Sequence, residues 1–447
     1  MERTSTASIK IVLGMFAALC AWNIYRAATR DVTPSEAWNY DRYIGATWQE
    51  SLQRYDVNNH VFNTFLVRIS TKRFHLTELS LRLPALLCGL LYLWAAWRLC
   101  RRLFGDGLML VASASLMTLN PLVVDALSEA RGYGMAMAFW LWALILMLEC
   151  LESFSERKLN LAAMCLALSV ASCLTFIVPA LGLLFAFLGR AGDRPALARH
   201  LILPFLIFAF VLLALPLNRV LLTDFAVGAT SLRQTLSELT AFSLTGLAVD
   251  PKVLAAVVRV ALALVLVVGA VEILRRKRDD MLTLTAGTAW IGVLILLAAH
   301  NLIDAPFPQR GAIYFVPVLT LTALALLRHS REAVLALSTG CILIYAVGFP
   351  AGGYLEGRDL QGSREIAKAL RADAKQRRVR IASSLELEPM MNYYGSRYRQ
   401  GNWGRVERRV PDPGADYYVL AGSDAPLIDR FQLHVILREP NIILAKP

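Results

Sequence analysis

The chain has 447 residues, of which 56% are hydrophobic and only 18% are charged, and its mean hydropathy is +0.50. A soluble globule of this length would carry more polar surface, so the composition indicates a membrane protein and excludes a soluble body on a single anchor. The net charge of +12 is divided among short basic clusters between apolar stretches, as in the loops of membrane proteins. We therefore expect membrane lipids as partners and no nucleic acid. The seven cysteines lie in or at the ends of apolar stretches, which predicts neither disulfides nor a thiolate metal site.

Apolar stretches of about 20 residues, long enough to cross a bilayer, recur along the chain. The basic clusters share one side if the N-terminus is cytoplasmic, so the positive-inside bias predicts an N-in, C-out topology. A division of 159–190 into two short spans underlies this topology, and a single span there would place the C-terminus inside. The eleven predicted spans are 9–28, 80–99, 107–124, 132–150, 159–175, 176–190, 200–218, 253–274, 281–300, 311–327 and 333–350.

Two long segments outside the spans are polar. Residues 29–79 are rich in aromatic and polar side chains, and the amphipathic stretch 60–69 predicts a helix that lies on the membrane surface. After residue 350, helical periodicity over 363–375 is followed by short strand-like runs, which predicts a small α/β domain on the outer face. The predicted strands are 379–383, 417–421, 433–437 and 442–445.

Several motifs of other membrane proteins are absent from the sequence. It has no Walker-type glycine loop, no paired CxxC, no HExxH and no Rossmann glycine fingerprint, which argues against a nucleotide-driven pump. The centres of the spans are nearly free of charge, which argues against a secondary transporter. Polar groups gather at the outer ends of the spans and in 29–79, so we expect chemistry at the outer membrane interface.

Three motifs occur in an order known from one enzyme family. They are NNHVFNTFLVRIS at 58–70, LTELSLRLPALLCGLLYLWAAWRLCRRLFG at 76–105 and LNPLVVDALSEARGYGMAMAFW at 119–140, and PQRGAIYFVPVLTL follows at 308–321. This set resembles the protein O-mannosyltransferase and aminoarabinose-transferase branch of the GT-C superfamily of membrane glycosyltransferases. The resemblance implies a transferase of the bacterial inner membrane that takes a sugar from a polyprenyl monophosphate, with its active site facing the periplasm.

The predicted fold class is therefore a polytopic α-helical membrane protein of about eleven transmembrane helices, N-in and C-out, with interfacial periplasmic helices. Its GT-C-like transmembrane domain is predicted at 1–350, including the periplasmic loop 29–79. The C-terminal periplasmic α/β domain is predicted at 351–447.

The sequence departs from the family pattern at two positions. Where the family has an Asp-Glu pair, whose aspartate is proposed as general base, this chain has Ser35 before Glu36. Where the family has His-Pro-Pro, this chain has 58–61, Asn-Asn-His-Val. A catalytically inactive GT-C-like partner protein is therefore one alternative.

Transfer from a polyprenyl phosphate needs a carboxylate that takes the acceptor's proton. Glu36 is the first candidate, beside Trp38, which could stack on a sugar. Its alternative is a structural role, because residues 33–36 also resemble a helix cap followed by an acidic first turn. Asp41 and Asp56 are the other candidates for the catalytic base.

The leaving phosphate needs cations to stabilise its charge. Arg131 and Arg310 are predicted at the outer ends of two spans, where arginine runs against the positive-inside trend, although simple snorkelling is the alternative. Lys72 is a third candidate for binding the lipid phosphate. The residues expected at the substrate are Asn59, His60, Trp38, Glu129 and Tyr133.

The metal requirement stays open, since His60 could bind a divalent metal with a carboxylate or could hydrogen-bond the sugar. We predict an inverting glycosyltransferase that uses a polyprenyl-phosphate-linked sugar as co-substrate. Its periplasmic acceptor would be lipopolysaccharide, capsule, a glycolipid or a protein. The alternatives are a transporter or flippase of lipid-linked glycans, a glycan ligase or polymerase, and the inactive partner.

Overall fold

The computed structural model divides into two compact units. The first unit comprises Met1–Ile24, Leu52–Asn63 and Pro84–Phe349, and the second comprises Tyr25–Ser51, Thr64–Leu83 and Pro350–Pro447. Within these ranges the structure describes residues 2–53, 59–191, 194–217, 228–245, 249–275, 279–349, 352–375, 377–398 and 403–447.

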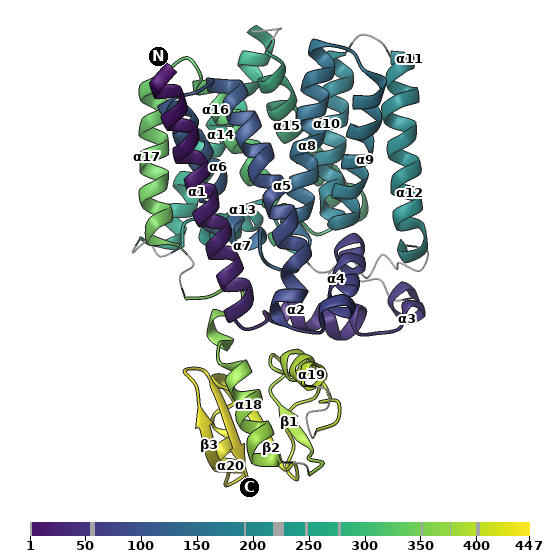
Figure 1. The fold of residues 1–447 in the computed structure, drawn as a ribbon, viewed down its shortest axis with the longest axis vertical. Helices are drawn as coiled ribbons and strands as arrows, with labels where there is room; N and C mark the ends of the chain where they lie inside the picture. The colour runs from purple at the N-terminus through teal and green to yellow at the C-terminus, as the bar shows by residue number, and fades with distance from the viewer. Residues whose placement is uncertain are drawn as a thin grey trace. The chain divides into compact units, whose positions relative to one another are not determined.

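The first unit is a bundle of helices (Figure 1). By length and composition, six helices of the described chain are apolar enough to cross a membrane, at Thr6–Thr29, Glu78–Phe104, Tyr133–Glu152, Lys252–Arg275, Asp280–Ile303 and Arg310–Leu327. The predicted class, a helical protein with several apolar helices, is confirmed, whereas the count of eleven spans stays a prediction. The helices of this unit, two of which continue into the second, are α1 (Glu2–Thr29), α5 (Glu78–Phe104), α6 (Leu108–Thr118), α7 (Pro121–Ala126), α8 (Tyr133–Glu152), α9 (Glu156–Ser172), α10 (Ile177–Arg190), α11 (Arg194–Leu197), α12 (Leu203–Leu217), α13 (Leu232–Ser243), α14 (Pro251–Arg275), α15 (Asp280–Ile303), α16 (Phe315–Leu327) and α17 (Arg331–Val347).

Helices α10 and α15 pack closely because each presents a glycine to the other. A Cβ atom on Gly182 would lie 2.8 Å from the backbone oxygen of Thr288. A Cβ atom on Gly287 would lie 2.9 Å from the Cβ atom of Ala186. Small residues at such crossings let two helix backbones approach, which is the usual way in which apolar helices associate inside a membrane.

The predicted span 107–124 is wrong as a single helix. Helix α6 ends at Thr118, and α7 begins anew at Pro121. The Asn120 side chain caps α7, because its Oδ1 accepts hydrogen bonds from the backbone N–H groups of Leu122 at 3.0 Å and of Val123 at 3.4 Å. An asparagine cap followed by proline is a helix start, and it interrupts a stretch that composition alone presents as continuous.

The segment 159–190 forms two helices, as predicted, and not one. Helix α9 ends at Ser172, Cys173 is extended with φ −157° and ψ 117°, and Leu174–Phe176 form a 3₁₀ turn before α10. The alternative of one continuous helix is therefore excluded.

The second unit contains two groups of elements. From the predicted polar loop come α2 (Pro34–Asn39), the π-helical turn Tyr40–Ile44, most of α3 (Trp48–Gln53) and most of α4 (Val61–Phe74). Helix α4 confirms the helix predicted at 60–69. The other group is α18 (Ser363–Ala374), β1 (Ile381–Ser383), α19 (Glu388–Arg397), β2 (Tyr417–Ala421), α20 (Leu427–Arg430), β3 (His434–Arg438) and β4 (Ile442–Lys446).

The strands form one four-stranded sheet in the order β1-β2-β4-β3, and only the pair β1 and β2 is parallel. Every residue of β2 is buried, as expected of a central strand. Helix α18 packs on β4 and buries Ile366, Ala367 and Leu370, which follow the helical spacing of an amphipathic face. The helix at 363–375 and the four strands are thus confirmed as elements, and the domain division at 350 stays a prediction.

Gly132 fixes the turn between α7 and α8. Its φ of +76° lies in the left-handed region, which glycine adopts without steric cost. A Cβ atom at this position would also lie 2.2 Å from the backbone oxygen of Ser172. The turn therefore requires glycine both for its conformation and for the close approach of α9.

We expect Gly132→Ala to lower the midpoint of thermal unfolding of the purified protein in detergent, because the left-handed conformation alone costs about 1–2 kcal/mol. Gly340→Ala is the control, since Gly340 lies inside α17 where a Cβ atom would meet nothing within 4 Å, and alanine there gains up to about 1 kcal/mol. A Gly132→Ala protein as stable as the wild type would contradict this account of the turn.

Candidate functional site

The turn before α8 presents Arg131 in the first unit. The Asn63 side chain supports this turn by donating a hydrogen bond from Nδ2 to the backbone oxygen of Ala130 at 3.0 Å. The guanidinium of Arg131 lies 5.1 Å from the centre of the Tyr133 ring, within the range of a cation–π contact. Arg131 is only 8% exposed, so this positive charge is held in a largely water-excluded place.

Arg310 comes to the same place from the 3₁₀ turn Arg310–Tyr314, which precedes α16. Its Nη1 lies 3.9 Å from Oε1 of Glu129, and its guanidinium lies 4.5 Å from the centre of the Phe242 ring. Thr175 supports the turn, because its hydroxyl donates to the backbone oxygen of Gly311 at 2.9 Å. Glu129 and Arg131 belong to one turn, in which the backbone N–H of Arg131 donates to the backbone oxygen of Glu129 at 2.8 Å, so the pairing with Glu129 brings Arg310 to the turn of Arg131.

His60 completes this group. Its ring lies 5.1 Å from the ring of Tyr133 at an angle of 66°, and the side chain is 3% exposed. Among the residues that the structure describes, its Nε2 has no hydrogen-bond partner. Burial, and then the charge of Arg131, lower the pKa of His60 from 6.5 to about 3. We call these five residues the arginine cluster: His60, Glu129, Arg131, Tyr133 and Arg310.

Glu36 lies in the second unit in a fully buried ion pair. Arg82 donates two hydrogen bonds to the Glu36 carboxylate, from Nε to Oε1 at 2.9 Å and from Nη2 to Oε2 at 2.6 Å, and neither side chain is exposed. Oε2 also accepts from the backbone N–H of Thr33 at 2.9 Å, while the Thr33 hydroxyl accepts from the N–H of Glu36, which completes a capping box. The cap predicted at 33–36 is confirmed. Because both carboxylate oxygens are occupied, the geometry favours a structural role for Glu36.

Arg82 is satisfied beyond its ion pair. It donates to the backbone oxygens of Arg30 at 2.8 Å and Asp31 at 2.6 Å, and its guanidinium lies 4.3 Å from the centre of the Tyr354 ring. Arg26 lies 4.4 Å from the same ring. A buried charge with this many partners can be accommodated at little cost.

A second ion-pair group in this unit was not among the residues predicted from the sequence. Glu78 is buried and binds both Arg364, at 2.7 Å, and Arg397. Ser35 also has a distant partner, since its hydroxyl and backbone N–H donate to Glu356. The only local signal for this group was Glu78 itself, which lies four residues before Arg82 in the ELSLR motif. The residues that pair with Glu78 and Ser35 lie far away along the chain.

Trp38 and Asp41 line a cavity of about 330 Å³ in the second unit. The indole of Trp38 has the guanidinium of Arg42 4.1 Å from its centre and that of Arg408 4.8 Å away. Oδ2 of Asp41 accepts a hydrogen bond from Arg405 at 2.5 Å. The Asp41 side chain is 19% exposed, whereas that of Glu36 is fully buried, so Asp41 is the more accessible of the two carboxylates.

The remaining predicted site residues lie apart from these groups. Asn59 is buried in the first unit beside His60 in sequence, and Lys72 is exposed on α4 in the second unit. Asp56 lies outside the described residues. Within the described ranges, no group of three or more His, Cys, Asp or Glu side chains lies close enough to hold a metal ion.

Comparison with known proteins supports one fold. A family model described as dolichyl-phosphate-mannose-protein mannosyltransferase matches residues 61–218. The structure of ArnT from Cupriavidus metallidurans bound to undecaprenyl phosphate has a TM-score of 0.59 and 14% identity, covering 97% of each chain. The chain has the GT-C fold. The resemblance predicted from the sequence is thereby confirmed.

Other solved structures are consistent with this fold. ArnT in the apo state has a TM-score of 0.59 and 14% identity, over 99% of this chain and 98% of that chain. The oligosaccharyltransferase from Archaeoglobus fulgidus in complex with Zn and sulfate has a TM-score of 0.51 and 12% identity, over 92% and 68%. No curated protein sequence is significantly similar to the chain.

We expect Arg82→Gln to destabilise the protein by about 3–5 kcal/mol, because it leaves the carboxylate of Glu36 buried without its charge partner. Lys368→Gln is the control, since Lys368 forms an exposed pair with Glu365 that is worth at most about 0.5 kcal/mol. Unfolding by denaturant in mixed micelles measures both. Equal stability of the two variants would show that the buried pair does not hold the second unit together.

The lowered pKa of His60 predicts a pH effect on stability. The neutral imidazole is retained in the folded protein down to about pH 3, whereas the unfolded chain binds a proton near pH 6.5. The unfolded state therefore gains a proton first, and stability falls as the pH drops below about 6.5. In His60→Gln we expect a smaller loss of thermal stability between pH 7 and pH 4 than in the wild type. His434→Gln, at an exposed position, should follow the wild-type curve.

Proposed function

We propose that the chain is an inverting glycosyltransferase that moves a sugar from a polyprenyl monophosphate to an acceptor at the periplasmic face of the bacterial inner membrane. The observation that carries this proposal is the arginine cluster, in which two guanidiniums from separate turns lie close together. Arg131 lies 5.1 Å from the centre of the Tyr133 ring, and Arg310 lies 3.9 Å from Glu129. The shared fold supports it, since ArnT has been solved with undecaprenyl phosphate bound. The acceptor class remains as predicted: lipopolysaccharide, capsule, a glycolipid or a protein.

The reaction fits the charges of the cluster. An acceptor hydroxyl attacks the anomeric carbon, the bond from that carbon to the phosphate oxygen breaks, and the carbon inverts. The leaving polyprenyl phosphate gains a negative charge, which Arg131 and Arg310 can bind as planar forks. Glu129 and Tyr133 orient the two arginines. The neutral imidazole of His60, beside Tyr133, can donate a hydrogen bond to the sugar or accept one from it.

The acceptor's proton needs a carboxylate, and the three predicted candidates remain. Asp41 is favoured as the base because its side chain is partly exposed, whereas Glu36 is buried in an ion pair with Arg82. Asp56 remains a candidate base because of its position in the sequence, three residues before Asn59. Trp38 and Asn59 remain candidate sugar contacts, and Lys72 remains a candidate phosphate contact.

We propose an N-in, C-out topology of eleven spans, with the small α/β domain at 351–447 in the periplasm. The ion pairs of the first unit support it. Lys158 at the start of α9 pairs with Glu149 near the end of α8, and Arg190 at the end of α10 pairs with Asp280 at the start of α15. Basic residues thus gather at one end of the bundle, as positive-inside loops do. Arg131 precedes α8 and so lies at the other end of that helix.

A transfer assay in native membranes tests the proposal. Undecaprenyl-phosphate-linked sugars are supplied in turn, and release of undecaprenyl phosphate and labelling of endogenous acceptors are measured. We expect Arg131→Ala and Arg310→Ala each to lower kcat/KM by about 10²-fold or more, because each removes charge stabilisation of the leaving group. Arg233→Gln is the matched control, an exposed arginine on α13, the helix that contacts the 3₁₀ turn of Arg310.

The same assay identifies the base. The variants are Glu36→Gln, Asp41→Asn and Asp56→Asn. Loss of the general base lowers kcat by about 10²–10⁴-fold and leaves the unfolding midpoint at the wild-type value, so the variant with this behaviour identifies the base. Turnover of diphosphate-linked glycans alone would identify a ligase, and movement of an unmodified lipid-linked glycan would identify a flippase. Binding of the donor without turnover would identify an inactive partner protein.

A further inference from the structure

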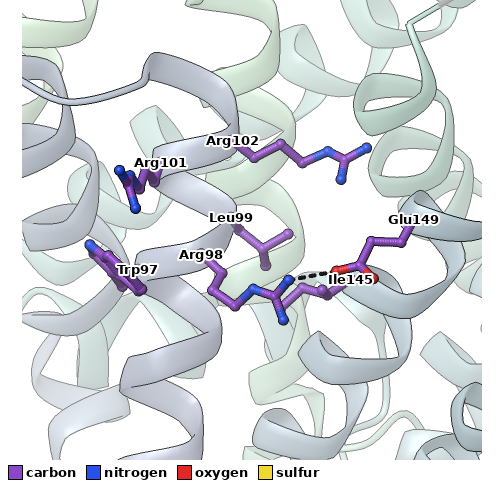
Figure 2. A pocket seen from close by; sticks show the side chains of 7 residues that line it. All are labelled: Trp97, Arg98, Leu99, Arg101, Arg102, Ile145 and Glu149. Atoms are coloured by element: carbon purple, nitrogen blue, oxygen red, sulfur yellow. Dashed lines mark hydrogen bonds and ion pairs between the residues drawn. The ribbon is translucent and has the colours of Figure 1, made fainter. Parts of the chain in front are cut away.

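A cavity of about 290 Å³ lies between the last turns of α5 and α8 in the first unit. Figure 2 shows the side chains of Arg98 and Arg102 reaching from α5 toward α8 on either side of the opening, while Arg101 points away. The cavity is lined by Trp97, Arg98, Leu99, Arg101, Arg102, Ile145 and Glu149. Its lining residues Ile145 and Glu149 are about three to five turns along α8 from Arg131, which lies before the start of the helix, so the cavity lies roughly 20–25 Å from Arg131 and the two sites are distinct.

The charges around the cavity do not balance. Glu149 is shared by two cations, with Arg98 at 2.6 Å and Lys158 at 2.8 Å. Arg102 pairs with Glu152 at 2.6 Å, and Arg101 pairs with Asp106 at 2.8 Å. These ion pairs of the described residues contain four cations and three carboxylates, which leaves an excess of one positive charge.

Arg98 and Arg102 are also neighbours on one face of α5, one helical turn apart, where like charges repel. The side chain of Arg98 is 38% exposed and that of Arg102 is 30% exposed, so both side chains are partly accessible. An anion held between them would relieve the repulsion, and a phosphate can accept forked hydrogen bonds from both.

The surface of α5 that leads away from the cavity is apolar. Leu87, Leu90 and Trp94 are 56%, 51% and 52% exposed, and they precede Arg98 at helical spacing along the same face. Trp94 packs edge to face against Trp142 at 4.8 Å, and the guanidinium of Arg98 lies 5.4 Å from Trp142. Two guanidiniums next to an indole and two leucines match a ligand that has an anionic head and an apolar chain.

We propose that this cavity binds the phosphate of an anionic membrane phospholipid, with one acyl chain along Leu90 and Trp94. The bound lipid bridges α5 and α8 and stabilises the protein. This site is independent of the proposed glycosyl transfer, and it works whether or not the chain is an active enzyme.

The test uses the purified full-length protein in detergent. Phosphatidylglycerol, phosphatidylcholine and inorganic phosphate are titrated separately, and bound lipid is counted by native mass spectrometry. We expect phosphatidylglycerol to bind at least tenfold more tightly than phosphatidylcholine. The double variant Arg98→Gln/Arg102→Gln should lose that preference. Arg157→Gln is the matched control, because it removes one exposed positive charge near the start of α9 but does not line the cavity.

A second measurement does not depend on the stability of any variant. A photoreactive phosphatidylglycerol is crosslinked to the wild-type protein, and the proposal requires labelled peptides that contain residues 90–102 or 142–149. Equal affinity for the two phospholipids, or labelling elsewhere only, would overturn the proposal. Tight binding of inorganic phosphate without a preference for the anionic lipid would show an ion site and would also overturn it.

Discussion

Arg82 and Glu36 are both fully buried, so neither charge is solvated by water and each depends on the other. The guanidinium uses its remaining N–H groups on the backbone oxygens of Arg30 and Asp31, which fixes the chain after α1. The carboxylate closes the capping box that begins α2. One ion pair therefore sets both the path of the segment 29–36 and the direction of the helix that carries Trp38.

The fold could be predicted where its signal is local. The helix at 363–375 and the strands of the sheet follow from periodicities of 3.6 and 2, because one face of each is buried. The break at Asn120 was missed because a hydropathy window counts apolar residues and ignores caps. A division of 159–190 into two spans is predicted from its length, which is too long for one span and too short for two ideal ones. The predicted boundary after residue 175 lies within the 3₁₀ turn Leu174–Phe176 that follows Cys173.

The candidate site was predictable in part. Glu129, Arg131 and Tyr133 are close in sequence, and charge at the outer end of a span singled out Arg310 as well, so the arginine cluster could be expected from local rules. The partners of Glu78 could not be expected. Arg364 and Arg397 lie 286 and 319 residues away along the chain, and no local pattern reports an ion pair across such a separation.

The π-helical turn at Tyr40–Ile44 follows α2 without a break. Such a turn holds one residue more than an α-helical turn, and one residue corresponds to a rotation of about 100° around the helix axis. A homologue with an ordinary α-helix here would therefore have one residue fewer, and its alignment with this chain would carry a one-residue gap within 40–44. Placing that gap one column too early or too late would match Asp41 or Arg42 with a side chain from another face of the helix.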